Sequence, residues 1–175
     1  MSDDELIEHA QSLLAHNAYL TLATVDAERR PWTSPVYFAA DGLTDFYWVS
    51  SPDAHHSRNL TARPAVSLVV FDSTVRPYHG RALYADGAAH ELGPDELDRG
   101  LRVYPGPAER GGAVLTAADV TGAAPWRLYR AQATHVWALC PRAPRAACPR
   151  HGRTDDHRVE VEATASGTAS FPLLP

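Results

Sequence analysis

The stretch FYWVSSPDAHHSRNLTARPAVSLVVF, residues 46–71, holds the pattern on which the fold depends. It opens with an aromatic run and closes with the apolar run AVSLVVF, and both have the length and composition of β-strands. Between them, SSPDAHHSRNL gathers hydroxyls, two adjacent histidines, an arginine and an asparagine. This order predicts a short polar helix between two strands, with Asp53 as its cap.

The sequence on both sides continues as strands and turns. AYLTLATV (18–25) and PWTSPVYFAA (31–40) are extended runs around the turn DAERR, and two prolines exclude a helix interior from the second run. Downstream, GRALYADGAAHEL (80–92) predicts a long strand bent at Gly87. WRLYRAQATHVWAL (126–139) and DHRVEVEA (156–163) predict two further strands.

Helices are few and lie between or before the strands. SDDELIEHAQSLLAHNA (2–18) has apolar residues at three- and four-residue spacing, and GPDELDRGLRVY (93–104) has proline near its start and acids in its first turn. Residues 105–125 are weakly patterned and long enough for a lid or an insertion, with one helical turn around TAADV. We expect one domain over residues 1–165 and a mobile tail over 166–175, mainly β (α+β), with six to seven mostly antiparallel strands in a barrel.

Composition limits the classes of function. The net charge is −5 and the pI about 5.9, which disfavours nucleic acid as a partner. All 16 cationic side chains are arginine, so no lysine can form a Schiff base or grip a phosphate. No apolar run is long enough to span a bilayer, and the start is acidic, so we expect a cytoplasmic protein without a membrane partner.

The polar segment 50–60 suits an anion. A helix that begins directly after a strand presents free backbone N–H groups and the positive end of its dipole, which favour a phosphate group. Histidines beside a bound dianion should have raised pKa values and add positive charge. A solvated helix start with capping serines explains the same residues without any ligand.

The order of these parts resembles a known family. LATVDAERRPWTSPVYFAADGLTDFYWVSSPDAHHSRNLTARPAVSLVVFDS (22–73), followed by GRALYADGAAHEL, is similar to the pyridoxamine 5'-phosphate oxidase-like family of FMN-binding split β-barrels. The resemblance covers about residues 18–92, with a Ser-Pro-Val strand, an aromatic strand ending in serines, a short helix with Asn-Leu, and a Gly-x-Ala strand.

The resemblance implies a homodimer with FMN in a groove between two barrels. It places one strand segment beside the flavin ring, a second at the ribityl and phosphate end, and the His-His pair where the pyridoxamine phosphate oxidases have Arg-Lys on the phosphate. An arginine on the next strand would reach the same cofactor from the partner subunit. The cofactor-binding residues implied in this way are Thr33, Ser34, Pro35, Val36, Tyr47, Trp48, Val49, Ser50, His55, His56, Ser57, Arg58, Asn59 and Arg81.

Two departures from the family pattern bear on function. The His-His pair gives less assured positive charge than Arg-Lys, which leaves a deazaflavin as an alternative cofactor. The C-terminal segment HGRTDDHRVEVEATASGTASFPLLP does not align with the Arg-rich tail with which the pyridoxamine phosphate oxidases hold their substrate. We therefore expect an FMN-dependent oxidoreductase acting on another small organic substrate, with no catalytic side chain identifiable; the alternatives are a deazaflavin-dependent reductase and a non-catalytic flavin- or heme-binding protein.

A loose set of metal-ligand residues lies near the C-terminus, in CPRAPRAACPRHGRTDDH (140–157). Structural zinc would need Cys140, Cys148, His151 and His157 to converge. Because their spacing is irregular and the segment is rich in Pro and Arg, the sequence favours an ordinary surface loop, and we predict no metal.

Overall fold

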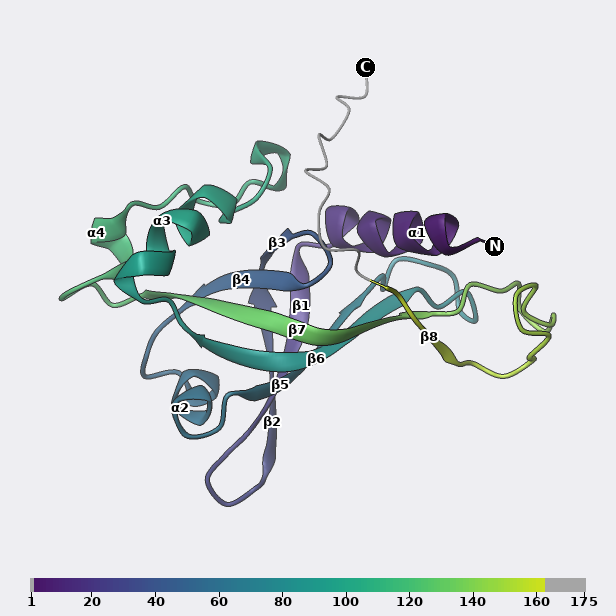
Figure 1. Ribbon diagram of the computed structural model, residues 1–175, viewed down its shortest axis with the longest axis horizontal. Helices are drawn as coiled ribbons and strands as arrows, with labels where there is room; N and C mark the ends of the chain where they lie inside the picture. The colour runs from purple at the N-terminus through teal and green to yellow at the C-terminus, as the bar shows by residue number, and fades with distance from the viewer. Residues whose placement is uncertain (1, 163–175) are drawn as a thin grey trace.

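A computed structural model describes residues 2–162, so the predicted tail (166–175) and the end of the predicted domain lie outside the described residues. One strongly curled antiparallel sheet forms the body of the molecule (Figure 1). Its order is β2-β1-β5-β6-β7-β4-β3, and β8 pairs with β7 beside this path. The strands are β1 (Tyr19–Val25), β2 (Pro31–Tyr37), β3 (Ala39–Asp41), β4 (Asp45–Ser50), β5 (Ala65–Phe71), β6 (Ala82–Glu91), β7 (Arg127–Leu139) and β8 (Arg158–Glu160). The predicted split β-barrel is confirmed.

Helices cover the sheet at its edges and ends (Figure 1). They are α1 (Asp3–His16), α2 (His55–Ala62), α3 (Pro94–Val103), α4 (Ala117–Val120) and the single 3₁₀ turn η1 (Ala108–Arg110). A capping box between Ser2 and Glu5 starts α1, whose apolar stripe packs on β5, β6 and β7. Within residues 2–162, no helix combines the length and the apolar character that crossing a membrane requires.

Strand β4 separates two apolar clusters because its side chains alternate between the two faces of the sheet. Phe46 and Trp48 point into the main core, which α1 closes. Tyr47 and Val49 point to the other face, where α3 and α4 cover them with Leu97 and neighbouring residues. The 105–125 segment therefore contributes to a second small core through α4.

A β-bulge bends β6 at the predicted position. The register with β7 shifts between Asp86 and Gly87, and a Cβ built on Gly87 would lie 2.0 Å from the carbonyl oxygen of Gln132. Only glycine leaves space for so close an approach of two backbones. The bend is what curls β6 and β7 around the core.

The structure differs in two local details from the sequence-based expectations. The run 31–40 is divided by Phe38, which is fully buried and whose N–H bonds to the carbonyl of Ala18, so that β2 and β3 are separate strands. Helix α2 begins at His55, and its N-cap residue is Ala54 rather than Asp53, with no side-chain cap hydrogen bond. The first N–H groups of α2 therefore lack a cap from the protein's own side chains.

Candidate functional site

The barrel is split between β2 and β4, and α2 inserts a histidine into the split. Strands β2 and β3 form the two ends of the sheet order, so no backbone ladder joins β2 to β4 in the described chain. One ring nitrogen of His56 lies 2.8 Å from Ser50 Oγ on β4, and the other lies 3.1 Å from Ser34 Oγ on β2. We call these three residues the His56 bridge. It fastens the predicted ring-side strand to the predicted phosphate-side strand.

His56 is buried inside the split rather than exposed on the polar side of the helix start. It is 8% exposed, and burial, assisted by the charge of neighbouring His55, lowers its pKa below the ordinary value. A neutral imidazole has one donor and one acceptor nitrogen, and two hydroxyl groups satisfy both because each can donate or accept. His56 therefore supplies position rather than positive charge.

A flat aromatic pair lies beside the bridge. The rings of Trp32 and His55 stack with centroids 4.2 Å apart and planes 7° apart. The indole N–H of Trp32 donates to Ser34 Oγ at 3.1 Å, which ties the pair to the bridge. Trp32 remains 44% exposed. The pair thus offers a planar apolar surface at the rim of the split.

The other predicted residues of α2 divide between core and solvent. Asn59 is buried and donates to Thr24 Oγ1 on β1 at 3.0 Å, and Ser57 is buried as well. Arg58 is exposed, and its guanidinium donates to the carbonyl of Asp53. Arg58 is therefore the cationic side chain that α2 presents to solvent next to its uncapped start. Thr24, which sequence reasoning missed, is brought to Asn59 by the packing of α2 on β1.

Along β2, neighbouring residues face opposite ways. Ser34 and Val36 pair with Leu22 and Leu20 and face the barrel interior. Thr33 and Pro35 are exposed on the opposite face. Because β2 ends the sheet order, its outer backbone edge is free of a partner strand among residues 2–162. That edge is available to a polar ligand or to another chain.

On β4, side chains predicted to line a cofactor belong to the core. Trp48 is fully buried and stacks on Tyr129 at 5.8 Å, while Tyr47 is 1% exposed on the other face. Val49 is half-buried over the second core, and Ser50 is bound to His56. In this chain, β4 can therefore offer a ligand backbone groups more readily than side chains.

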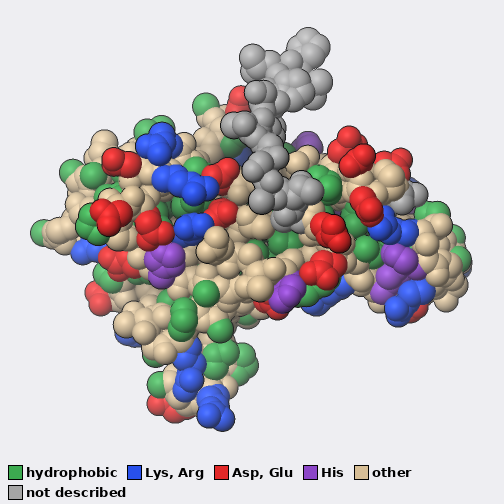
Figure 2. All heavy atoms as spheres, viewed as in Figure 1, with side chains coloured by type: hydrophobic (Ala, Val, Ile, Leu, Met, Phe, Trp, Pro, Cys, Tyr) green, Lys and Arg blue, Asp and Glu red, His purple; other side chains and the backbone are tan. Residues whose placement is uncertain are grey.

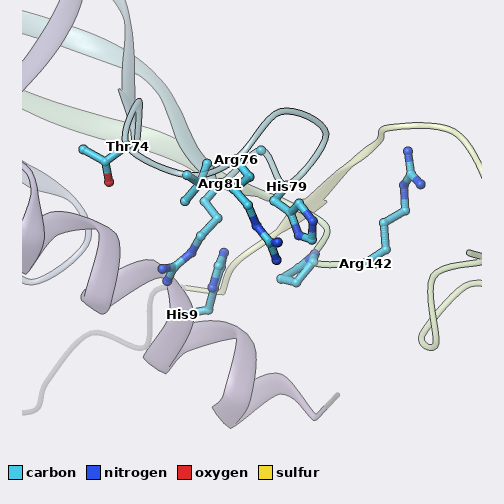
Figure 3. A pocket seen from close by; sticks show the side chains of 9 residues that line it. His9, Thr74, Arg76, His79, Arg81 and Arg142 are labelled. Carbon is cyan, nitrogen blue, oxygen red and sulfur yellow. The ribbon is translucent and has the colours of Figure 1, made fainter. Parts of the chain in front are cut away.

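Arg81 lies apart from these residues within one chain. It lines a hollow of about 590 Å³ between α1 and the β5–β6 loop, together with His9, Arg76, His79 and Arg142. Figure 3 shows the side chains of Arg81, Arg76 and His9 directed into the same space. Burial and the charge of Arg81 lower the pKa of His9. The prediction that Arg81 meets the cofactor across a dimer stays a prediction.

The sequence matches the family model described as pyridoxamine 5'-phosphate oxidase over residues 6–140. No curated protein matches it closely enough in sequence to be reported as a relative. Among solved structures, it is similar to a heme-binding protein from Mycobacterium smegmatis, with 20% identity and a TM-score of 0.64, over 93% of this chain and 60% of that one. The chain thus spans less than two thirds of that relative's length.

Two further solved structures cover most of their own length. The heme storage protein HutZ from Vibrio cholerae has 23% identity and a TM-score of 0.63, over 78% of this chain and 96% of that one. A structure described as F420 reductase has 26% identity and a TM-score of 0.51, over 72% of this chain and 94% of that one. The fold is therefore shared by proteins whose descriptions name different ligands.

Proposed function

The chain belongs to the pyridoxamine 5'-phosphate oxidase family, and from this premise we propose that it is a homodimeric oxidoreductase that binds FMN and acts on a small organic substrate. The observation that carries the proposal is the His56 bridge, which holds β2, β4 and the start of α2 together beside an exposed aromatic pair. These are the elements that the family resemblance assigns to the ring and the phosphate.

The start of α2 suits a phosphate through its backbone N–H groups rather than through His56. Its first N–H groups have no side-chain cap, and Arg58 lies exposed in the first turn. Backbone N–H groups at a helix start bind phosphate without any side-chain charge. Because His56 is buried and bound to two serines, the charge of the phosphate would be met by these N–H groups, by Arg58 and by the partner's Arg81.

The protein's part in the reaction would be to orient and shield. FMN, when bound, supplies the hydride and electron transfer. The free backbone edge of Thr33–Val36 would hold the polar edge of the ring, and Trp32 would exclude water from one side. This role would require no acid–base side chain.

An exposed sheet face supports a homodimer. Tyr19 on β1 is 62% exposed and Phe71 on β5 is 51% exposed, on strands that lie next to each other in the sheet. Large aromatic side chains on an open sheet face are typical of a surface that another chain covers. A second copy placed there would complete a groove along the edge of β2.

A deazaflavin is the second candidate for the same site. The neutral His56 provides less positive charge than the Arg-Lys pair of the pyridoxamine phosphate oxidases, and a structure described as F420 reductase is 26% identical to this chain. Heme is the alternative from another class, because three arginines and two histidines line the hollow beside α1 and would suit carboxylate groups and an iron ligand.

The test is to purify the protein without added cofactor, record its near-ultraviolet and visible absorption, and identify any released ligand by mass. FMN, deazaflavin and hemin are then titrated separately. We expect FMN at one per subunit and reduction by a nicotinamide donor. Tight hemin binding with a Soret band and no flavin uptake would overturn the proposal.

A matched pair of variants locates the site. Trp32→Ala should weaken FMN binding by about fivefold or more, since an aromatic contact contributes about 1 kcal/mol. Trp126→Ala is the control, because Trp126 is similarly exposed, at 50%, but lies just before β7. Equal effects of the two substitutions would contradict a cofactor at the Trp32–His55 pair.

A further inference from the structure

The loop between β7 and β8 brings four metal-ligand side chains together, contrary to the expectation of an ordinary surface loop. One ligand atom from each of Cys140, Cys148, His151 and His157 lies within 4.8 Å of the other three. Figure 2 shows charged and histidine side chains gathered at the right-hand end of the molecule, where Figure 1 places this loop. We call these four residues the Cys/His cluster.

The separations within the cluster are close to those of a tetrahedral zinc site. His151 Nδ1 lies 3.6 Å from Cys140 Sγ, 3.5 Å from Cys148 Sγ and 3.1 Å from His157 Nε2. With Zn–S bonds of about 2.3 Å and Zn–N bonds of about 2.0 Å, a tetrahedron has S···N edges of about 3.5 Å and N···N edges of about 3.3 Å. The two sulfur atoms are 3.0 Å apart, nearer than the tetrahedral S···S edge of about 3.8 Å, so binding would separate them slightly.

Hydrogen bonding alone does not account for this arrangement. A histidine Nδ1 has either one proton to donate or one lone pair to accept, yet three ligand atoms surround that of His151. Both cysteines are free thiols and buried, at 4% and 1% exposed. Four lone-pair donors aimed at one point are the arrangement that a cation stabilises.

The backbone holds each ligand in place. The N–H of Cys140 donates to the carbonyl of His157 at 2.9 Å, which extends the β7–β8 pairing to the cluster. Cys148 and His151 belong to a tight turn in which the N–H of Gly152 donates to the carbonyl of Cys148 at 2.8 Å, with Gly152 at a φ of +67°. The N–H of His151 also donates to Cys148 Sγ at 3.4 Å.

The second histidine has the tautomer that ligation needs. Nδ1 of His157 lies 2.9 Å from the carbonyl oxygen of Asp155. A carbonyl only accepts, so Nδ1 carries the proton and the lone pair is on Nε2, the atom that faces His151. Metal-binding histidines commonly have such a carbonyl partner on their other nitrogen.

We propose that Cys140, Cys148, His151 and His157 bind one structural Zn²⁺, which fastens the loop 141–156 and the short strand β8 to the end of β7. Two thiolates balance the charge of the ion. Four protein ligands leave no open position for a substrate, so the role is structural rather than catalytic. Because β8 has only three residues in its ladder, the metal would supply much of the order of this end of the chain.

The experiment uses the full chain without a polyhistidine tag, grown with zinc and purified without chelators. Elemental analysis should give one zinc per chain. Replacement by Co²⁺ should give the intense visible bands and the thiolate charge-transfer absorption of tetrahedral cobalt. A chelator strong enough to remove the zinc should lower the Tm.

Two ligand variants and one control make the assignment specific. Cys148→Ser and His157→Gln should reduce the metal content from one per chain to near zero, and the chelator should no longer change their Tm. His135→Gln is the control, since His135 is a half-exposed histidine of β7 paired with Asp86 at 3.0 Å, and it should retain the metal.

Three outcomes would overturn the proposal: wild-type protein without stoichiometric zinc that gives no tetrahedral cobalt spectrum, ligand variants that retain full metal content, or an intact mass lower by two hydrogens in a Cys140–Cys148 disulfide. If the variants fail to fold, the wild-type metal content and cobalt spectrum decide alone. None of these readouts depends on flavin binding.

Discussion

Replacing His56 by alanine removes the side chain that joins β2 to β4, and its cost follows from the structure. Two hydrogen bonds are lost, at 2.8 Å to Ser50 and 3.1 Å to Ser34, each contributing about 0.5–1.5 kcal/mol. Ser50 is 8% exposed, and leaving its hydroxyl without a partner costs about 1–3 kcal/mol, an amount that overlaps with the loss of its hydrogen bond to His56. We expect His56→Ala to lower the free energy of unfolding by about 2–4 kcal/mol.

Urea unfolding followed by tryptophan fluorescence, at one fixed protein concentration, measures this loss. His55→Ala is the matched control, because it removes only the exposed stack on Trp32 and should cost about 0.5–1.5 kcal/mol. The double variant Ser34→Ala with His56→Ala tests the coupling directly and should cost less than the sum of the two single changes. Equal costs for the two histidines, or full additivity, would refute the bridge.

Further predictions concern titration, backbone approach and a buried ion pair. Because burial lowers the pKa of His56, the unfolded chain binds a proton more readily than the folded chain. The free energy of unfolding should therefore fall as the pH drops below about 6.5, and it should fall less in His56→Gln. Urea titrations at a series of pH values measure both. Gly87→Ala should lower the free energy of unfolding by about 1–3 kcal/mol, because the new Cβ meets the backbone of β7. Gly93→Ala is the control and should cost little, because the space around Gly93 is open. Thermal unfolding compares the two, and similar Tm values would count against the bulge. Arg130→Met should lower the free energy of unfolding by about 3–5 kcal/mol, since it leaves the buried carboxylate of Asp45 without the arginine whose Nε contacts it at 2.6 Å. Adding Asp45→Asn should restore part of the loss in the same assay. No restoration would argue against the pair.

Local sequence signals predicted most of the sheet. Gly87 in an otherwise regular strand pattern predicted the bend, and the structure has a bulge there. Asp53 failed as a cap because helix α2 starts one residue later than such a cap requires, at His55, with Ala54 as its N-cap residue. The preference for capping residues locates the first residue of a helix only to within one turn. Here the connection from β4 to α2 fixed that residue.

The candidate site was less predictable because its geometry is non-local. His56 is 22 residues from Ser34, and only the closure of the barrel brings them within 3.1 Å. The sequence alone could not show that the histidine is buried and neutral, since its neighbours His55 and Arg58 are polar and more exposed. The family resemblance selects this segment as the cofactor site but does not describe what its side chains do.

The Cys/His cluster shows the same limit. Its ligands follow no regular spacing, because Cys140 and His157 directly flank the paired strands β7 and β8 while Cys148 and His151 belong to one turn. Pairing between β7 and β8 and the turn at Gly152 had to be known before the four residues could be placed together. The spacing of ligands along the sequence identifies a four-ligand metal site only when each pair of ligands lies within a single turn.

The split gives this barrel a different mechanical character from that of a closed one. A ladder of backbone hydrogen bonds separates only when a whole strand unpairs. The free energy needed to open a closed barrel is therefore close to that of sub-global unfolding. A contact made by a single imidazole releases when one ring changes rotamer, and the strands on either side keep their own ladders. Separating β2 from β4 at the His56 bridge would thus require one side-chain torsion to change and no ladder of the sheet to break.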